Sequence, residues 1–156
     1  MDLDSAKRLA EGLLYEHGLP GWSFRFDHSR RRFGVCIPGG KRIQLSRHLT
    51  RLNGEAQVKD TILHEIAHAI AFVEHGPNVA HDRRWKKIAA AIGAEPRTKY
   101  DPAGVETPQL RYIVKCAHHG ILGQRARKWH GPRSCSRCHK GFNAAYLVEL
   151  LPNPAF

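Results

Sequence analysis

The chain has 156 residues, of which 42% are hydrophobic and 25% are charged, a balance that fits one globular domain with a small appendage. No stretch reaches the roughly 18 consecutive apolar residues of a membrane span, so we expect no membrane association. The formal net charge of +11 favours polyanionic partners, because each neutralised phosphate releases condensed counterions.

The N-terminal residues and the cysteines indicate a reducing compartment. Residues 1–5 include two aspartates and lack the basic and apolar regions of a signal peptide. Three of the four cysteines lie near the C-terminus at metal-ligand spacing, which suits reduced thiols better than a disulfide framework. Cys36 stands apart in an apolar stretch and is predicted to be a small buried hydrophobe. We therefore expect a cytoplasmic protein, associated with the nucleoid if it is bacterial.

A helix followed by three short strands is predicted for the N-terminal part. Residues 3–17 place their apolar side chains on one helical face, and Gly18 and Pro20 end that helix. Apolar and polar residues then alternate, and turn residues separate the runs. The predicted strands cover residues 22–27, 32–37 and 41–45.

Two further helices are predicted in the middle of the chain. Asn53 is the predicted N-cap of a long helix over 54–74, whose wide apolar stripe suits burial. A shorter helix is predicted over 82–92, and Gly93 ends it.

The C-terminal third is predicted to form a separate unit. Residues 94–108 contain three prolines and one glycine without a hydrophobic period, which is typical of a linker. Short β-like runs follow over 111–115 and 144–150, around the cysteine cluster. The predicted organisation is a first domain over 1–93, a linker over 94–108 and a second domain over 109–156.

The long helix contains the run His64-Glu65-Ile66-Ala67-His68, which matches the H-E-x-x-H pattern. Residues four apart differ by about 40° around a helix and by one turn in height, so both imidazoles can reach one metal ion. Glu65 can approach a zinc-activated water without ligating the metal, and it can act as general base when that water attacks a peptide carbonyl. The motif therefore predicts a catalytic zinc held by His64 and His68.

A third protein ligand is expected, because a catalytic zinc commonly takes three and leaves one position open. Glu74, His75 and Glu95 are candidates by their distance along the chain. His81 is favoured, because it follows the helix break at Gly76 and Pro77 and directly precedes the next helix, so a loop can turn it back.

A second cluster has the spacing of a structural zinc site. Two short pairs, Cys116 with His119 and Cys135 with Cys138, are separated by fifteen residues. This spacing is typical of a four-ligand zinc ribbon, which stabilises a small β-unit and leaves no position for substrate. The alternatives for the histidine ligand are His118, His130 and His139.

Basic residues are concentrated in the same C-terminal region. Between Gln109 and Val148 there are eight Lys or Arg residues and no acidic ones, which indicates affinity for polyanions. The indole of Trp129 can either stack on an unpaired base or pack over the ribbon. The candidate nucleic-acid contacts are Arg125, Arg127, Lys128, Trp129, Arg133 and Arg137.

With these motifs the chain resembles the SprT-like metalloprotease family, which includes the eukaryotic protease Spartan. The resemblance rests on residues 42–46 before the long helix, on the motif at 64–68, on His81 with Trp85 four residues later, and on the C-terminal zinc ribbon.

The resemblance implies an α+β fold, in which zincin-like helices pack on a small antiparallel sheet and a C-terminal β zinc ribbon follows. It also implies a zinc endopeptidase that acts on DNA-bound or DNA-crosslinked proteins, with single-stranded or damaged DNA as a partner. Two positions depart from the family pattern: Asp82 stands where a glycine is usual, and His119 stands where members often have cysteine.

The substrate path and the competing functions complete these expectations. An extended substrate can pair with an exposed edge strand beside the metal, and the strand over 41–45 is our candidate for that edge. The candidates for stabilising the oxyanion are Tyr100, Arg97 and His75.

Two functions are alternatives to a DNA-associated zinc endopeptidase: a non-catalytic DNA-binding protein on a zincin scaffold and a DNA-independent zinc protease. Glu65 argues against the first, and the basic C-terminal segment argues against the second.

Overall fold

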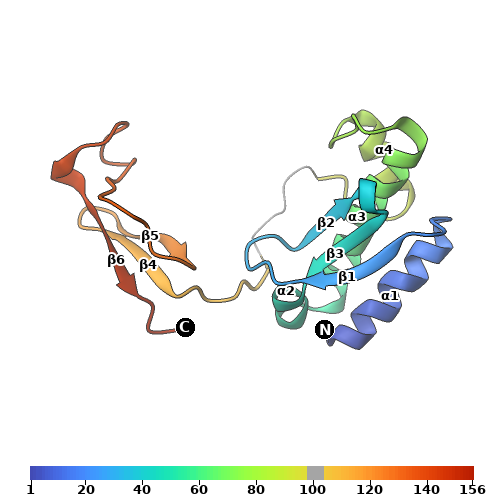
Figure 1. The fold of residues 1–156 in the computed structure, drawn as a ribbon, viewed down its shortest axis with the longest axis horizontal. Coiled ribbons are helices and arrows are strands. Elements are labelled where there is room, and N and C mark those ends of the chain that lie inside the picture. Colours follow the sequence, from blue (N-terminus) through green and yellow to red (C-terminus); the bar gives the residue numbers. More distant parts are fainter. Residues whose placement is uncertain (98–103) are drawn as a thin grey trace. The chain divides into compact units, whose positions relative to one another are not determined.

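The computed structural model describes residues 1–97 and 104–156 (Figure 1). The chain forms two compact units, Met1–Pro108 and Gln109–Phe156, which we call unit 1 and unit 2. Unit 1 combines helices with a small sheet and unit 2 is built mainly from strands, so the chain has the predicted α+β composition. None of the helices within the described residues has the length and apolar character that a membrane crossing requires.

Unit 1 has the predicted helices and strands in the predicted order, with one further short helix over residues 47–52. The Asp2 carboxylate caps the first helix by accepting the N–H of Ser5 at 2.8 Å. Ser46 caps a short helix in the same way, through the N–H of Leu49 at 3.1 Å. The elements are α1 (Leu3–Glu16), β1 (Ser23–Asp27), β2 (Gly34–Ile37), β3 (Arg42–Ser46), α2 (Arg47–Leu52), α3 (Glu55–His75) and α4 (Arg83–Ala91).

The sheet of unit 1 is mixed, with the strand order β1-β3-β2. β2 and β3 are joined by the short turn Pro38–Gly40 and pair antiparallel as a hairpin. β1 pairs parallel with the other side of β3, from Ser23 opposite Arg42 to Asp27 opposite Ser46. The predicted antiparallel arrangement therefore applies to one of the two strand pairs in this sheet.

The central position of β3 corrects the predicted substrate edge. Residues 42–45, most of the strand predicted over 41–45, belong to β3, and both sides of β3 are occupied by β1 and β2. The edge strand that packs against α3 is β2. Alternation along a strand determines which side chains face inward but not the place of the strand in its sheet, so the sequence indicated the wrong strand.

Helix α3 is the central element of unit 1. Its buried side chains contact α1, α4 and the inner face of the sheet. The sheet contributes Phe24, Ile43 and Leu45, since alternate residues of a strand face the same side. This packing fixes the direction in which each side chain of α3 points.

The start of α3 differs from the prediction by one residue. Gly54 is the N-cap, whereas the preceding Asn53 is buried. The Asn53 amide donates to the carbonyl oxygens of Leu49 at 2.8 Å and Glu106 at 2.9 Å, and its oxygen accepts the N–H of Glu106 at 2.9 Å. Asn53 therefore ties residue 106 to α2 instead of capping α3.

The described flanks of the predicted linker over 94–108 pack on unit 1. Ala94 is buried in the core, and the N–H of Glu95 donates to the Asp60 carboxylate at 2.9 Å. Together with the hydrogen bonds between Asn53 and Glu106, these contacts attach the described flanks of the segment to unit 1. Residues 98–103 of the predicted linker lie outside the described residues.

Unit 2 is a three-stranded antiparallel sheet with the order β5-β4-β6. Its strands are β4 (Tyr112–Cys116), β5 (Gly120–Arg125) and β6 (Val148–Pro152). The sequence predicts β4 but not β5, whose two glycines weaken the strand pattern. Residues 144–146, predicted as the start of the last strand, form a 3₁₀ turn before β6.

The apolar core of unit 2 is very small. All residues of this unit are described, and three of them are buried, Leu110, Cys116 and Cys135. Two of the three are cysteines of the predicted zinc site, so apolar burial contributes little to the stability of unit 2.

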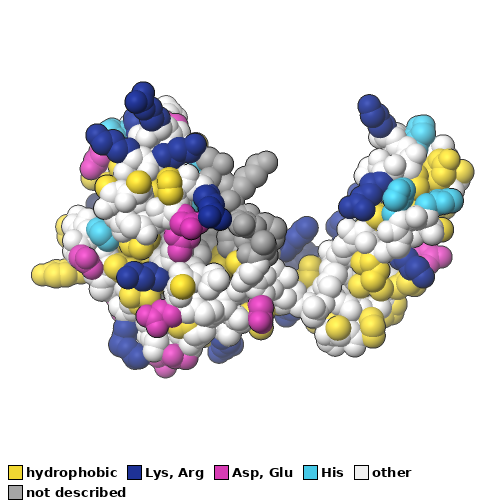
Figure 2. Space-filling view, turned by 180° about the vertical axis from the view of Figure 1, so that it is seen from behind, with side chains coloured by type: hydrophobic (Ala, Val, Ile, Leu, Met, Phe, Trp, Pro, Cys, Tyr) yellow, Lys and Arg dark blue, Asp and Glu magenta, His cyan; other side chains and the backbone are white. Residues whose placement is uncertain are grey.

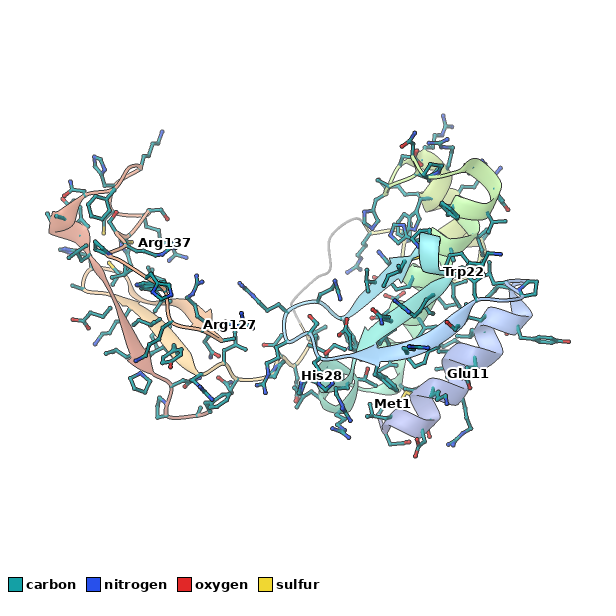
Figure 3. All side chains as sticks on the ribbon, in the orientation of Figure 1. Met1, Glu11, Trp22, His28, Arg127 and Arg137 are labelled. Carbon is teal, nitrogen blue, oxygen red and sulfur yellow. The ribbon has the colours of Figure 1, made fainter. Side chains whose placement is uncertain are left out.

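Acidic side chains are scarce on unit 2 (Figure 2), where Glu149 is the single acidic residue. In Figure 3, Arg127 lies beyond the end of β5, while Arg137 lies elsewhere on the unit, between two of the clustered cysteines in sequence. The basic character predicted for residues 109–148 is therefore a property of a whole folded unit and not of one strand.

Candidate metal centres

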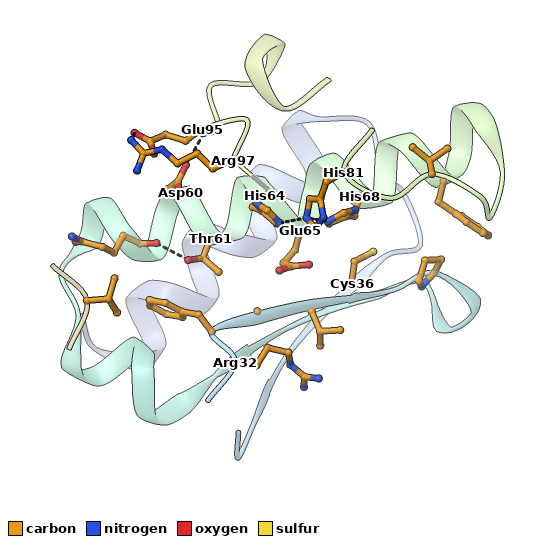
Figure 4. Close-up of a pocket in the computed structure, with 18 of the residues that line it drawn as sticks. Arg32, Cys36, Asp60, Thr61, His64, Glu65, His68, His81, Glu95 and Arg97 are labelled. Atoms are coloured by element: carbon orange, nitrogen blue, oxygen red, sulfur yellow. Dashed lines mark hydrogen bonds and ion pairs between the residues drawn. The ribbon is translucent and has the colours of Figure 1, made fainter. Parts of the chain in front are cut away.

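Helix α3 presents His64 and His68 on one face, one turn apart (Figure 4). Their ring centroids lie 5.1 Å apart, and both side chains are half-buried. Ile62 and Ile66 are fully buried on the same helix, so the packing of α3 holds the two imidazoles at the rim of the core.

The loop after α3 returns His81 to these two histidines. Gly76 ends α3 with a positive φ of 81°, a conformation in which glycine is favoured. His81 Nε2 lies 3.0 Å from the Nε2 atom of His64 and 3.0 Å from that of His68. The structure thus brings together the three residues that the sequence proposes as ligands.

Asp82 fixes the backbone directly after His81. Its carboxylate accepts the N–H of Arg84 at 2.9 Å and the N–H of Trp85 at 3.2 Å, and it is the N-cap of α4. Asp82 therefore has a local role, because it starts the helix that follows the third histidine.

The three imidazoles fit a zinc ion. A neutral imidazole nitrogen offers one donor or one acceptor in the ring plane, so His81 Nε2 cannot satisfy both neighbours by hydrogen bonding. Nitrogen ligands of a tetrahedral zinc with bonds of roughly 2.0–2.1 Å lie about 3.3 Å apart, close to the 3.0 Å observed here. Three protein ligands leave a fourth position for water or substrate.

Burial keeps these histidines neutral. It is the main cause that lowers the pKa of His64 and of His68 to about 4, and the charges of neighbouring histidines act in the same direction. Burial also lowers the pKa of His81, assisted by the Lys86 ammonium. At neutral pH the three rings are therefore free of the extra proton that competes with a metal ion.

Trp85 packs against all three histidines. Its side chain is 0% exposed, and its ring centroid lies 4.7 Å from that of His64, 5.1 Å from His68 and 4.6 Å from His81. Trp85 is therefore a core residue. Its contact with the histidine cluster arises from the packing of α4 on α3.

Glu65 lies between α3 and β2 and is 7% exposed (Figure 4). Burial raises its pKa to about 7, while the backbone N–H of Cys36 and the positive charge of Arg32 act in the opposite direction. A cation held by the histidines would also favour the ionised form. The carboxyl group is therefore suited to accept a proton near neutral pH.

Cys36 is less buried than the sequence predicts. It is half-buried on β2 and lines the same cavity as Glu65. Burial, followed by the negative charge of Glu65, raises the pKa of its thiol to about 12. The thiol therefore stays protonated and is a poor nucleophile.

A cavity of about 790 Å³ extends past the histidines and Glu65, with α3 on one side and β2 on the other. The residues that line it near the start of α3 include charged side chains, Arg31, Asp60 and Glu95. The residues that line it near the end of α3 include apolar side chains, Phe72, Pro77 and Val79. The cavity therefore continues on both sides of the three histidines.

The remaining candidate ligands lie outside the histidine cluster, and the candidate oxyanion groups differ in their positions. Glu74 Oε2 is 3.6 Å from His75 Nε2 at the exposed end of α3, and Glu95 pairs with Arg97 at 2.8 Å. Arg97 lines the cavity, whereas His75 is not among the described residues that line it. Tyr100 lies outside the described residues.

The second predicted metal site also comes together. Cys116, His119, Cys135 and Cys138 present ligand atoms within 4.8 Å of one another. The His119 Nδ1 atom lies 3.7 Å, 3.7 Å and 3.3 Å from the three sulfur atoms. A tetrahedral zinc with bonds of about 2.3 Å separates two sulfurs by about 3.8 Å, close to the 3.6 Å between Cys116 and Cys138. A four-ligand set has no open position, so it suits a structural ion.

The alternative ribbon histidines have other surroundings. The His118 ring lies 5.7 Å from that of Tyr146, His139 Nδ1 lies 3.2 Å from the backbone nitrogen and oxygen of Gly141, and His130 is exposed. The geometry therefore favours His119 as the fourth ligand.

Two arginines of unit 2 lie over the ring of Trp129. The Cζ atoms of Arg125 and Arg133 lie 5.3 Å and 5.7 Å from its centroid. Lys128 makes a similar contact with Tyr112 at 5.9 Å. Cation–π contacts of this kind hold the guanidinium groups near one another. The structure thus brings together three of the six candidate nucleic-acid contacts, while Arg127 and Arg137 are exposed.

Sequence reasoning missed the close approach of Gly34 to Glu65. A Cβ atom at this position would lie 2.7 Å from Glu65 Oε1. The signal in the sequence is an isolated glycine within a predicted strand, a pattern that often marks a close approach of two segments.

Comparison with known proteins places unit 1 in a family. The sequence model of the SprT-like family matches residues 6–106, which include the histidine cluster and Glu65. Protein SprT of Vibrio parahaemolyticus is 25% identical over 135 residues, covering 83% of this chain and 82% of that protein. Protein SprT of Shewanella oneidensis is 24% identical over 136 residues, covering 80% of this chain and 84% of that protein. The chain belongs to the SprT-like family.

Proposed function

We propose that this protein is a zinc-dependent endopeptidase that acts on proteins bound or crosslinked to DNA. The observation that carries the proposal is the joint position of three converging histidine nitrogens and a buried carboxyl group beside a cavity of about 790 Å³. A zinc site that served folding alone would be closed by a fourth protein ligand and would need no carboxyl group beside it.

The chemistry follows from the positions of the four side chains. Zinc held by His64, His68 and His81 would supply Lewis acidity and lower the pKa of water in its open position to about 7. Glu65 takes a proton from the water molecule while the oxygen of that water forms a bond to the peptide carbonyl carbon. Glu65 then gives that proton to the peptide nitrogen as the C–N bond breaks, so the carboxylate is regenerated for the next turnover.

The substrate is proposed to bind as an extended segment along β2. This strand is the edge next to α3, and its residues Gly34, Val35 and Cys36 line the cavity. Pairing with an edge strand uses main-chain hydrogen bonds, which depend little on the side chains of the substrate. We therefore expect weak sequence preference, with selectivity coming from the place to which DNA brings the substrate.

Unit 2 is proposed to provide the contact with DNA. It carries eight Lys or Arg residues against one Glu, and its arginines over Trp129 form a local cationic cluster. Phosphate binding by such residues is largely electrostatic and weakens as salt rises. In a bacterial cell, this affinity would bring the protein to the nucleoid.

The substitution Glu65→Gln tests the proposed function. Gln keeps the shape of the side chain but cannot accept a proton, so we expect cleavage of a basic DNA-binding protein to fall roughly 10²–10⁴-fold. Both proteins should contain about two zinc ions per chain, since no ligand is changed. Single-stranded DNA should increase cleavage by the wild type.

The matched control is Glu74→Gln, which changes an exposed glutamate at the end of the same helix. This variant should cleave at the wild-type rate. If wild type and Glu65→Gln were equally inert, zinc-loaded and able to bind DNA, the protein would be a non-catalytic DNA-binding protein. Cleavage that DNA left unchanged at both low and moderate salt would indicate a DNA-independent protease.

A further inference from the structure

We propose that Gly34 is a positioning residue for Glu65, because the missing side chain at this point of β2 provides the space that the carboxyl group occupies. The inference rests on the proposed function, since it acts through the general base.

A side chain at residue 34 would overlap the carboxyl group. An ideal Cβ would lie 2.7 Å from Glu65 Oε1, 2.9 Å from Glu65 Cγ and 2.9 Å from Thr61 Cγ2. Non-bonded carbon atoms are at their optimum separation at about 3.5–4.0 Å, so a methyl group cannot fit without movement. Glu65 is 7% exposed and its helix is packed against the core, so a shift away from residue 34 would move the carboxyl group into the cavity that it lines.

Backbone conformation does not explain the glycine. Gly34 is not among the described glycines with positive φ, and it pairs regularly with Leu45 in the β2–β3 ladder. Glycine inside a strand loses more conformational entropy on folding than other residues and packs no side chain. The space that the glycine leaves is occupied by the side chains of Glu65 and Thr61, and the Glu65 carboxyl oxygen comes closest to it.

The register of β2 directs residue 34 towards α3. Gly34 and Cys36 lie opposite Leu45 and Ile43, both of which are buried in the core. Alternate residues share a face, so the position faces the helix that carries Glu65. The backbone N–H of Cys36 also acts on this carboxyl group, because it opposes the rise in the pKa of Glu65 that burial causes. β2 therefore leaves space for Glu65 at residue 34, while its edge is proposed to receive the substrate.

Steady-state kinetics of Gly34→Ala provide the first test. We expect kcat to fall on the order of tenfold to hundredfold, because displacement of a catalytic group by about 1 Å has effects of this size. KM and zinc content should stay close to wild type, since neither the edge hydrogen bonds nor the histidines change. Gly39→Ala is the matched control in the same hairpin, where a Cβ meets nothing within 4 Å, and it should keep wild-type kinetics.

A thermal-stability cycle tests the contact without any measurement of activity. Gly34→Ala should lower Tm clearly in the wild type and much less in a Glu65→Ala background, because the colliding side chain is then absent. Folding of Gly34→Ala only in the Glu65→Ala background would support the contact equally. Thr61→Ser removes the other crowded methyl while keeping the hydroxyl that donates to the Gln57 carbonyl at 2.8 Å. It should not restore kcat to Gly34→Ala.

Four results would overturn the inference. They are an unchanged kcat in Gly34→Ala, a zinc loss that accounts for the lost activity, recovery of kcat by Thr61→Ser, and an equal fall in Tm in both backgrounds. If the wild type had no protease activity, the proposed function would fail, and the Tm cycle would still decide whether Gly34 makes room for Glu65.

Discussion

At the scale of single residues, one side chain that offers no metal ligand packs against the whole histidine cluster. Trp85 is fully buried and contacts the rings of His64, His68 and His81. Its indole Nε1 is buried and has no hydrogen-bond partner among the described residues. A buried donor without a partner costs roughly 1–3 kcal/mol, so shape and packing must account for the indole at this position.

Two replacements of Trp85 distinguish the contribution of its packed ring from that of its indole N–H group. Trp85→Ala should lower the free energy of unfolding by about 3–5 kcal/mol and weaken zinc binding at the histidine site, because the rings lose their common support. Trp85→Phe should lose less, since it keeps an aromatic ring and removes the unpaired donor. Chemical denaturation measures the first effect, and competition with a chelator measures the second. Wild-type zinc affinity in Trp85→Ala would contradict a role in orienting the histidines.

At the scale of elements, the connection between α3 and α4 determines whether the third histidine reaches the other two. Residues 76–82 join the helices, and the last of them, Asp82, caps α4 immediately after His81. Aspartate ranks above glycine as an N-cap, since its carboxylate accepts the free N–H groups of the first turn. Asp82 therefore strengthens the start of α4.

The variants Asp82→Ala and Asp82→Asn test this role. Asp82→Ala should lower Tm and weaken zinc binding at the histidine site, whereas Asp82→Asn should remain close to wild type because the amide oxygen can cap the helix. Thermal denaturation with and without zinc measures both effects. Equal losses in the two variants would show that the ion pair with Arg84, at 2.7 Å, matters more than the cap.

At the scale of the whole molecule, the two units differ in what keeps them folded. Unit 1 has a continuous apolar core shared by α1, α3, α4 and the sheet. Unit 2 buries three residues, and two of them are the zinc-site cysteines Cys116 and Cys135. Small units with so little apolar burial usually need a metal or disulfides to fold.

Removal of a ribbon ligand should therefore unfold one unit only. We expect Cys135→Ser to reduce zinc to about one ion per chain and to unfold unit 2, while unit 1 stays folded. Two-dimensional NMR spectra of the full chain would show loss of dispersed signals from unit 2 alone. Stimulation of proteolysis by DNA should be lost with it. His118→Ala is the control, and unfolding of both units in Cys135→Ser would contradict independent stability.

The sequence alone determined what depends on local geometry. His64, Glu65 and His68 could be placed on one helix face because the α-helix repeats every 3.6 residues. The pair Cys135 and Cys138 could also be recognised from local geometry, because its spacing lets both sulfurs reach one ion within a tight turn. The order of helices and strands in unit 1 also followed from local periodicity and from turn residues.

The tertiary structure alone decided what depends on contacts between distant segments. It brought His81 to the cluster while Glu74 and Glu95 lie elsewhere, and it placed β3 in the centre of the sheet with β2 at the edge. It also set Gly34 against Glu65. Local patterns specify how a segment folds and which side it buries, but the choice of its neighbour follows from the packing of the whole core.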